Sequence, residues 1–92
     1  MKLVIRDRAR DDLDAIYAWI AKDAPRVADV VVARILQSAR ILSRFPYIGR
    51  PGKIAGTHEW PVPRLPYLIV YRVDVDNTVV HIEAVLHTAR DR

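Results

Sequence analysis

The first half of the chain has the hydrophobic spacing of helices. A short β-branched run, "KLVIR" at residues 2–6, predicts a strand and is followed by aspartate-rich sequence that suits the early turns of a helix. Apolar residues then recur at helical spacing: Leu13, Ile16, Tyr17 and Ile20. We expect this helix to end before Pro25, because proline interrupts a helix but is favoured in the first turn of the next one.

A second helix is predicted over residues 26–44. Its apolar residues fall on one broad face: Val27, Val30, Val31, Ile35, Ile41, Leu42 and Phe45, widened by Val32, Leu36 and Ala39. The joint between the two predicted helices is only a few residues long, so they are expected to form a helical hairpin.

The second half of the chain changes to the period of strands. "PYIGRPGKIAG", residues 46–56, is rich in proline and glycine and predicts a loop. "THEWPV", residues 57–62, predicts a strand that its prolines confine to an edge or end early. "YLIVYRVDV", residues 67–75, and "TVVHIEAVLH", residues 78–87, share the Asp/Asn turn "DVDNT" and predict an antiparallel hairpin with a central first strand.

Side chains alternate between the two faces of a strand, so the residues of the last predicted strand fall into two sets. One set is expected to lie in the core: Val80, Ile82, Ala84 and Leu86. The other is expected on the open face: Val79, His81, Glu83, Val85 and His87. Because the chain crosses only once from helices to sheet, the predicted fold class is α+β. We expect a single domain over residues 1–92, with an N-terminal strand and a helical hairpin on one face of a small antiparallel sheet.

Composition and charge narrow the classes of function. The chain has no cysteine, which excludes disulfides and thiolate zinc sites, and it lacks both a signal-peptide pattern and a run long enough to span a bilayer. We therefore expect a soluble, cytoplasmic protein without membrane partners. The net charge is +4, and no acidic residue occurs between Asp29 and Glu59. The basic residues of that stretch fit an acidic protein segment or a nucleic acid, although Arg40 and Arg44 would also complement the end of a helix.

The polar C-terminal segment is the main candidate for chemistry. His87 could exchange protons while Arg90 binds a phosphate, as RNA cleavage would require, but a histidine and an arginine three residues apart are common. A metal site that combines Glu83 with His87 is disfavoured, because four residues of extended strand separate them by about 13 Å. Tyr67 and Tyr71 share one strand face and could hold a nucleobase or a partner side chain, or simply pack across the sheet.

Three segments resemble a known family. "PYIGRPG", "YLIVYRVD" and "VLHTARD" occur in the same order as in ParE-type toxins of the RelE/ParE toxin–antitoxin superfamily, whose members are also known as plasmid stabilisation proteins. The resemblance covers essentially the whole chain. It implies a toxin encoded beside an antitoxin, without a cofactor. RelE-like members of the superfamily cleave messenger RNA on the ribosome, whereas ParE-like members poison DNA gyrase by binding it.

Three positions favour the ParE branch over the RelE branch. RelE-type ribonucleases place lysines and an arginine on the two strands before the last hairpin turn, and this chain has Glu59, Pro61 and Leu68 there. These side chains cannot neutralise a phosphate, so only Arg90 remains of that pattern. No catalytic residue is therefore assigned. A ribosome-dependent mRNA endonuclease and a non-toxic binding module of the same fold remain the alternatives.

The resemblance also implies partners. A ParD-like antitoxin would combine a DNA-binding ribbon-helix-helix part with a flexible C-terminal segment that wraps the toxin, so that the toxin meets DNA only indirectly. The candidates for contact with gyrase are Arg64, Arg72, His87 and Arg90. The candidates for contact with the antitoxin are Tyr17, Trp19, Arg34, Arg40, Arg44 and Arg50. Trp19 is off the register of its helix, so it is expected to be an exposed aromatic anchor.

Overall fold

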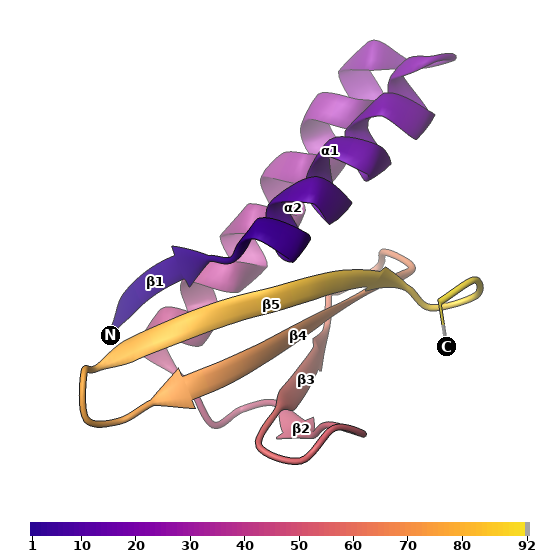
Figure 1. Cartoon of the computed structure of the whole chain (residues 1–92). Coiled ribbons are helices and arrows are strands. Elements are labelled where there is room, and N and C mark those ends of the chain that lie inside the picture. Colours follow the sequence, from indigo (N-terminus) through magenta and orange to yellow (C-terminus); the bar gives the residue numbers. More distant parts are fainter. Residues whose placement is uncertain (92) are drawn as a thin grey trace.

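The computed structural model describes residues 1–91 and contains two helices and five strands. In chain order these are β1 (Lys2–Ile5), α1 (Asp7–Ala21), α2 (Pro25–Arg44), β2 (Arg50–Pro51), β3 (His58–Pro61), β4 (Tyr67–Asp74) and β5 (Val79–His87). The two helices form a hairpin that lies on one side of the sheet and extends beyond it, as Figure 1 shows. This arrangement confirms the predicted α+β class and the helical hairpin. Within residues 1–91, neither helix has the length and apolar character needed to cross a membrane.

The sheet has the strand order β1-β5-β4-β3-β2. All neighbours are antiparallel except β1 and β5, which pair in parallel from Lys2 with Val79 to Ile5 with Ile82. The sheet is therefore mixed rather than purely antiparallel, because the chain's first strand adds to the outer edge of its last. The predicted loop also contains the two-residue strand β2, which pairs with β3. The β3 strand ends at Pro61, as its prolines predicted.

The helix hairpin buries only part of its apolar surface. The buried residues of α2 are Ala28, Val31, Ile35, Ser38, Ala39 and Leu42. Four residues that the sequence placed on the broad apolar face are exposed: Val27, Val30 and Ile41 of α2, and Phe45, which directly follows the helix. The broad apolar face of α2 is therefore only partly buried, because α1 and the sheet cover only one side of the helix. Tyr17, which was in register with the core residues of α1, is also exposed.

An irregularity in the β4–β5 pairing reverses the faces of the last strand. Val70 pairs with Ala84 but Tyr71 pairs with Ile82, so Glu83 is an extra residue in β5. Val80 and Ile82 lie in the core as predicted, but beyond Glu83 the parity changes. The core there contains Val85, and Leu86 faces the open side of the sheet with Val70 and Arg72. The uniform alternation that we predicted therefore fails for Val85, Leu86 and His87, whereas Ala84 is buried as expected, at 5% exposure.

The "PYIGRPG" segment is tied to the centre of the sheet by one buried hydroxyl. Tyr71 is fully buried, and its hydroxyl donates to the Pro46 carbonyl at 2.7 Å and accepts from the Gly49 N–H at 3.0 Å. Burial raises the pKa of this hydroxyl above its usual value. A Cβ at Gly49 would overlap the Tyr71 hydroxyl and come within 2.8 Å of the Glu59 carbonyl. Glycine is therefore required here by close packing.

The β3–β4 turn holds a residue in a left-handed conformation. The Leu65 N–H donates to the Val62 carbonyl, and Arg64 between them has a φ of 65°. A turn with proline before such a residue favours glycine at that position. Arg64→Gly is therefore expected to raise the free energy of unfolding by about 0.5 kcal/mol, because the relief of backbone strain exceeds the added freedom of the unfolded chain.

Urea unfolding of the wild type and the variant checks this expectation. Arg64→Ala is the matched control, since it removes the same side chain and keeps the strain, and its stability should stay close to that of the wild type. A glycine variant no more stable than the alanine variant would show that Arg64 is unstrained.

Candidate functional site

The C-terminal segment forms an ordered turn at the end of β5. Its backbone is closed by hydrogen bonds from the Arg90 and Asp91 N–H groups to the His87 carbonyl, at 3.1 and 2.8 Å. The Asp91 carboxylate accepts from the His87 N–H at 2.7 Å. The Thr88 N–H donates to the Pro66 carbonyl at 2.9 Å, which ties this turn to the β3–β4 turn. The backbone of residues 87–91 is therefore held in a defined turn.

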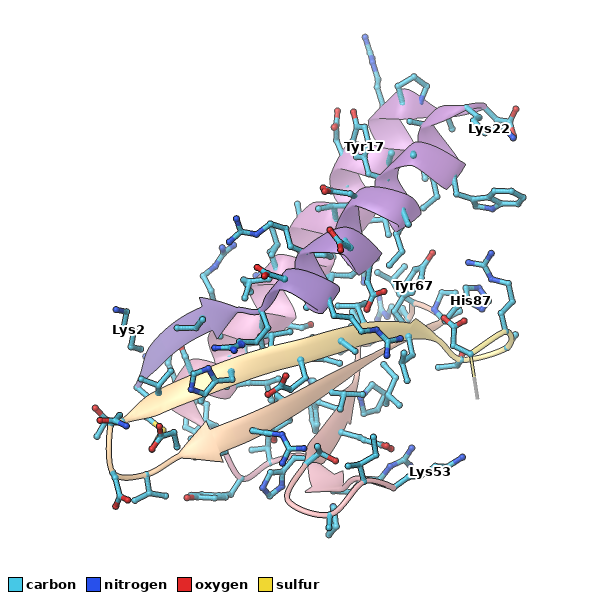
Figure 2. All side chains as sticks on the ribbon, viewed as in Figure 1. Lys2, Tyr17, Lys22, Lys53, Tyr67 and His87 are labelled. Atoms are coloured by element: carbon cyan, nitrogen blue, oxygen red, sulfur yellow. The ribbon has the colours of Figure 1, made fainter. Side chains whose placement is uncertain are left out.

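The reversal at Glu83 turns His87 towards the helical side of the sheet. Its ring packs edge-on against Tyr67, with ring centroids 5.4 Å apart, and Figure 2 shows the two side chains close together near the end of β5. The Nδ1 atom of His87 accepts from the Ala89 N–H at 3.2 Å. Tyr67 is buried in the core, so here it packs across the sheet.

A shallow cleft lies between α1 and this C-terminal turn. Its lining combines apolar, acidic and basic side chains: Asp12, Ala15, Ile16, Trp19, Val85, His87, Arg90 and Asp91. We name Trp19, His87 and Arg90 the C-terminal corner. Trp19 is 61% exposed, so the expectation that it is off the core register is confirmed. The Arg90 guanidinium lies 5.7 Å from the centroid of its indole ring, and the Lys22 ammonium lies 5.1 Å from it.

The chemistry of the C-terminal corner suits recognition. An exposed indole between two cations offers a flat apolar surface together with positive charge, and aromatic and arginine side chains supply much of the energy of protein interfaces. The corner therefore suits a partner surface that carries both apolar and acidic groups.

The other two target-binding candidates lie in different places. Arg64 is exposed in the β3–β4 turn, which the Thr88–Pro66 hydrogen bond links to the C-terminal corner. Arg72 lies on the open face of the sheet, where its Nε is 3.5 Å from a Glu83 carboxylate oxygen and its Nη1 donates to the Ala55 carbonyl. The structure thus brings His87 and Arg90 together and places Arg72 apart from them.

The residues at the ribonuclease positions also lie on or near the open face. Glu59 is 4% exposed, with its carboxylate 3.5 Å from the Arg50 guanidinium and accepting from the Lys53 N–H at 3.3 Å. Leu68 is buried, and Pro61 ends β3. This part of the sheet has a buried, ion-paired carboxylate at the position where a nuclease of the RelE type would need positive charge.

The antitoxin-binding candidates form no single surface. Tyr17 donates its hydroxyl to the Asp29 carboxylate, a hydrogen bond that raises the pKa of Tyr17, and so it faces α2. Arg34 donates to the Pro63 carbonyl at 3.2 Å, and Arg50 is paired with Glu59 beside the sheet. Arg40 and Arg44 are exposed along α2. Trp19 lies in the C-terminal corner beside the target-binding candidates.

Sequence reasoning did not find Lys22 or Asp12 as neighbours of the corner. Asp12 accepts from the Val85 N–H at 2.9 Å, a contact between residues 73 positions apart. No local signal predicts it, because the contact depends on how α1 crosses the end of β5. Among residues 1–91, no three histidine, aspartate or glutamate side chains gather closely enough to hold a metal ion.

Two comparisons with known protein sequences both point to a family of toxins. The model of the family described as ParE toxin of type II toxin-antitoxin system, parDE, matches residues 3–92. The curated protein "Putative toxin Y4kP" of Sinorhizobium fredii (strain NBRC 101917 / NGR234) is 44% identical over 80 residues, which are 87% of this chain and 80% of that protein.

Solved structures agree with this assignment. The chromosomal ParDE TA system from P. aeruginosa contains a chain with a TM-score of 0.84 and 26% identity, and the match covers 95% of both chains. A chain of the toxin-antitoxin complex RelBE2 from Mycobacterium tuberculosis matches with a TM-score of 0.67 and 30% sequence identity. The match covers 94% of this chain and 95% of that one. A chain of the RelBE toxin-antitoxin complex of E. coli matches with a TM-score of 0.68 and 15% sequence identity, over 91% of this chain and 92% of that one. At this identity the match shows a likeness of fold alone.

Proposed function

Because the chain belongs to the ParE family of toxins from type II toxin–antitoxin systems, we propose that it poisons DNA gyrase by binding and that a ParD-like antitoxin neutralises it. The observation that carries the first part is the C-terminal corner. There an exposed indole is flanked by Arg90 and Lys22, and the His87 ring is packed in place. These groups are arranged for contact with a protein surface, and the proposed action needs no bond-breaking group on the toxin.

A second candidate is cleavage of messenger RNA on the ribosome. It is favoured by the 30% identity to the M. tuberculosis complex. It is opposed by the open face of the sheet, where Arg50 is paired with Glu59 and Arg72 with Glu83. Arginines already bound to carboxylates are less able to bind the phosphates of RNA.

A cleavage assay with supercoiled plasmid, purified gyrase and ATP separates the two candidates. Gyrase poisoning predicts linear DNA that accumulates with toxin concentration after a denaturant trap. Cleaved messenger RNA in a parallel translation reaction, without linear DNA, would establish the nuclease instead. Activity in neither assay would refute both mechanisms.

Arg90→Ala is expected to weaken gyrase poisoning by about tenfold, because Arg90 is exposed and supplies one of the two cations over Trp19. The measurement is the toxin concentration that gives half-maximal linear DNA, alongside the melting temperature, which should not change. Arg10→Ala, at an exposed position of α1, is the matched control. Full potency of Arg90→Ala would remove the C-terminal corner from the gyrase contact.

Trp19→Ala is expected to weaken antitoxin binding by about tenfold or more while changing the stability of the toxin little, because the indole is 61% exposed. Since Trp19 adjoins Arg90, an antitoxin segment that covers the indole would also cover the proposed gyrase contact. Titration calorimetry with the purified antitoxin measures the change. An unaltered dissociation constant would place Trp19 outside the antitoxin interface.

A further inference from the structure

Every backbone N–H group of the turn that follows β5 has a hydrogen-bond acceptor. The His87 N–H donates to the Asp91 carboxylate at 2.7 Å, and the Thr88 N–H donates to a carbonyl oxygen of the β3–β4 turn at 2.9 Å. The Ala89 N–H donates to Nδ1 of His87 at 3.2 Å. The N–H groups of Arg90 and Asp91 both donate to the His87 carbonyl, at 3.1 and 2.8 Å. The backbone of this turn is therefore fully bonded.

Hydrogen bonds, rather than apolar burial, hold the C-terminal turn, which we define as residues 87–91. Residues 88–91 are exposed, so they gain little hydrophobic stabilisation. Ordering an exposed segment costs conformational entropy, which the hydrogen bonds must offset. Two of these bonds end on a side-chain acceptor, the carboxylate of Asp91 or Nδ1 of His87. A change at either side chain is therefore expected to loosen the turn.

The C-terminal turn determines where Arg90 lies. Its guanidinium is 5.7 Å from the centroid of the Trp19 ring, in the cleft between α1 and the end of β5. The attraction between a cation and an exposed indole is weak, so this contact alone would not fix an arginine on a mobile backbone. The N–H of Arg90 and that of the next residue bind the same carbonyl, that of His87. This double attachment fixes the backbone from which the Arg90 side chain extends.

His87 is itself anchored to the sheet. It is the last residue of β5 and pairs with Tyr67 of β4. Its ring packs edge-on against the buried Tyr67 ring, at 5.4 Å between centroids (Figure 2). The N–H, the carbonyl and Nδ1 of His87 are all used within the C-terminal turn. These groups hold the turn, whereas Trp19 and Arg90 present their side chains on the surface.

We propose that His87 and Asp91 are positioning residues for the gyrase contact. Their side-chain acceptors lock the C-terminal turn, and the locked turn holds Arg90 beside Trp19 so that both meet gyrase together. An arginine that is already in place loses less conformational entropy on binding, so a loosened turn weakens poisoning although no contacting group is removed. This inference rests on the gyrase poisoning proposed above, and it gives His87 a role within the toxin.

Substitutions of Asp91 test the carboxylate. Asp91→Ala is expected to raise the toxin concentration that gives half-maximal linear DNA by about fivefold, because Arg90 is no longer held in place. The melting temperature should stay near that of the wild type, since Asp91 is exposed. Asp91→Asn keeps an acceptor oxygen for the His87 N–H and should retain most of the potency. Asp76→Ala, at an exposed aspartate of the β4–β5 turn, is the matched control for the change in charge.

Two results of this series would overturn the proposal. Full potency of Asp91→Ala would show that the bond to His87 does not matter for poisoning. An equal loss in Asp91→Asn and Asp91→Ala would show that the charge of Asp91 acts on gyrase directly.

Double variants with Arg90→Ala test whether the effect passes through Arg90. In that background Asp91→Ala should change the potency less than about twofold, because no guanidinium remains to be positioned. His87→Phe keeps a ring against Tyr67 and removes Nδ1, so it should weaken poisoning in the wild-type background and change little in the Arg90→Ala background. Losses that multiply independently in the double variants would overturn the positioning role.

Nuclear magnetic resonance of the full chain tests the positioning without gyrase. The indole N–H signal of Trp19 can be assigned by its loss in Trp19→Phe. In Asp91→Ala and in His87→Phe this signal should move towards its position in Arg90→Ala, and in Asp76→Ala it should stay in place.

The two kinds of measurement separate the positioning role from the proposed function. Linear DNA from the wild type, together with an indole signal that Asp91→Ala and His87→Phe leave unmoved, would overturn the positioning role and leave gyrase poisoning standing. A wild-type toxin that gives no linear DNA would refute gyrase poisoning, and with it the role proposed here, even where the indole signal moves.

Discussion

Replacing Gly49 with alanine is expected to lower the free energy of unfolding by about 3 kcal/mol. The added Cβ would overlap the Tyr71 hydroxyl and lie 2.8 Å from the Glu59 carbonyl oxygen and 2.9 Å from Tyr71 Cε1. Two of these three atoms belong to a fully buried side chain and the third to the backbone of β3, so none can move aside cheaply. Displacing Tyr71 would also break its hydrogen bonds to Pro46 and Gly49.

Urea unfolding of four proteins measures this effect and assigns it to Tyr71. They are the wild type, Gly49→Ala, Tyr71→Phe and the double variant. Tyr71→Phe alone should lower the free energy of unfolding by about 1 to 2 kcal/mol, because it leaves the Gly49 N–H and the Pro46 carbonyl without their hydrogen-bond partner. Tyr71→Phe also removes the atom closest to the new Cβ at residue 49. The double variant should therefore lose less stability than the two single variants together. Strict additivity would show that the hydroxyl is not the obstacle.

Gly56 provides the comparison for Gly49. It has a φ of 82°, and an added Cβ would meet only the end of the flexible Arg72 side chain. Gly56→Ala should therefore cost about 1 kcal/mol through backbone strain alone. If both alanine variants cost the same, close packing at Gly49 is not the main effect.

Removing the Asp12 carboxylate is expected to lower the free energy of unfolding by about 2 kcal/mol. Strand β1 ends at Ile5, whose partner is Ile82, so within residues 1–91 no strand pairs with the later residues of β5 on the side opposite β4. The Val85 N–H donates instead to an Asp12 carboxylate oxygen at 2.9 Å. Val85 is 3% exposed, so in Asp12→Ala this N–H would remain in the fold without an acceptor.

Thermal and urea unfolding of Asp12→Ala and Asp12→Asn check this role. The asparagine variant keeps an acceptor oxygen and should lose less stability than the alanine variant. Asp11→Ala is the matched control, because Asp11 is exposed in the same turn of α1 and should cost only about 0.5 kcal/mol through the helix dipole. Equal losses in Asp11→Ala and Asp12→Ala would show that the bond to Val85 contributes nothing measurable.

Asp12 also links stability to the proposed function. It lines the same cleft as Trp19 and Arg90, and its bond to Val85 joins α1 to the end of β5. The two sides of the C-terminal corner, Trp19 on α1 and Arg90 after β5, are thus held together by this contact. Asp12→Ala is therefore expected to disturb the corner as well as the fold.

Local sequence was sufficient for the elements whose cause is local. The helical spacing from Leu13 to Ile20, the position of Pro25 and the turn "DVDNT" predicted the helical hairpin and the β4–β5 hairpin. Three short motifs indicated the family that the comparisons then supported. Trp19 was correctly expected to be exposed, because its helical register alone places it away from the core.

Tertiary structure alone decided which apolar and polar residues meet. Some side chains on and directly after α2 are exposed although they are as apolar as their buried neighbours: Val27, Val30, Ile41 and Phe45. They are exposed because α1 and the sheet do not cover that part of the helix. One extra residue, Glu83, turns His87 to the helical side of the sheet, and no feature of an alternating sequence announces such a bulge. Sequence periodicity reports the faces of each element, but the partners of those faces depend on contacts between residues far apart in the chain. The element order was therefore determined by the sequence, whereas the C-terminal corner exists only in the folded molecule.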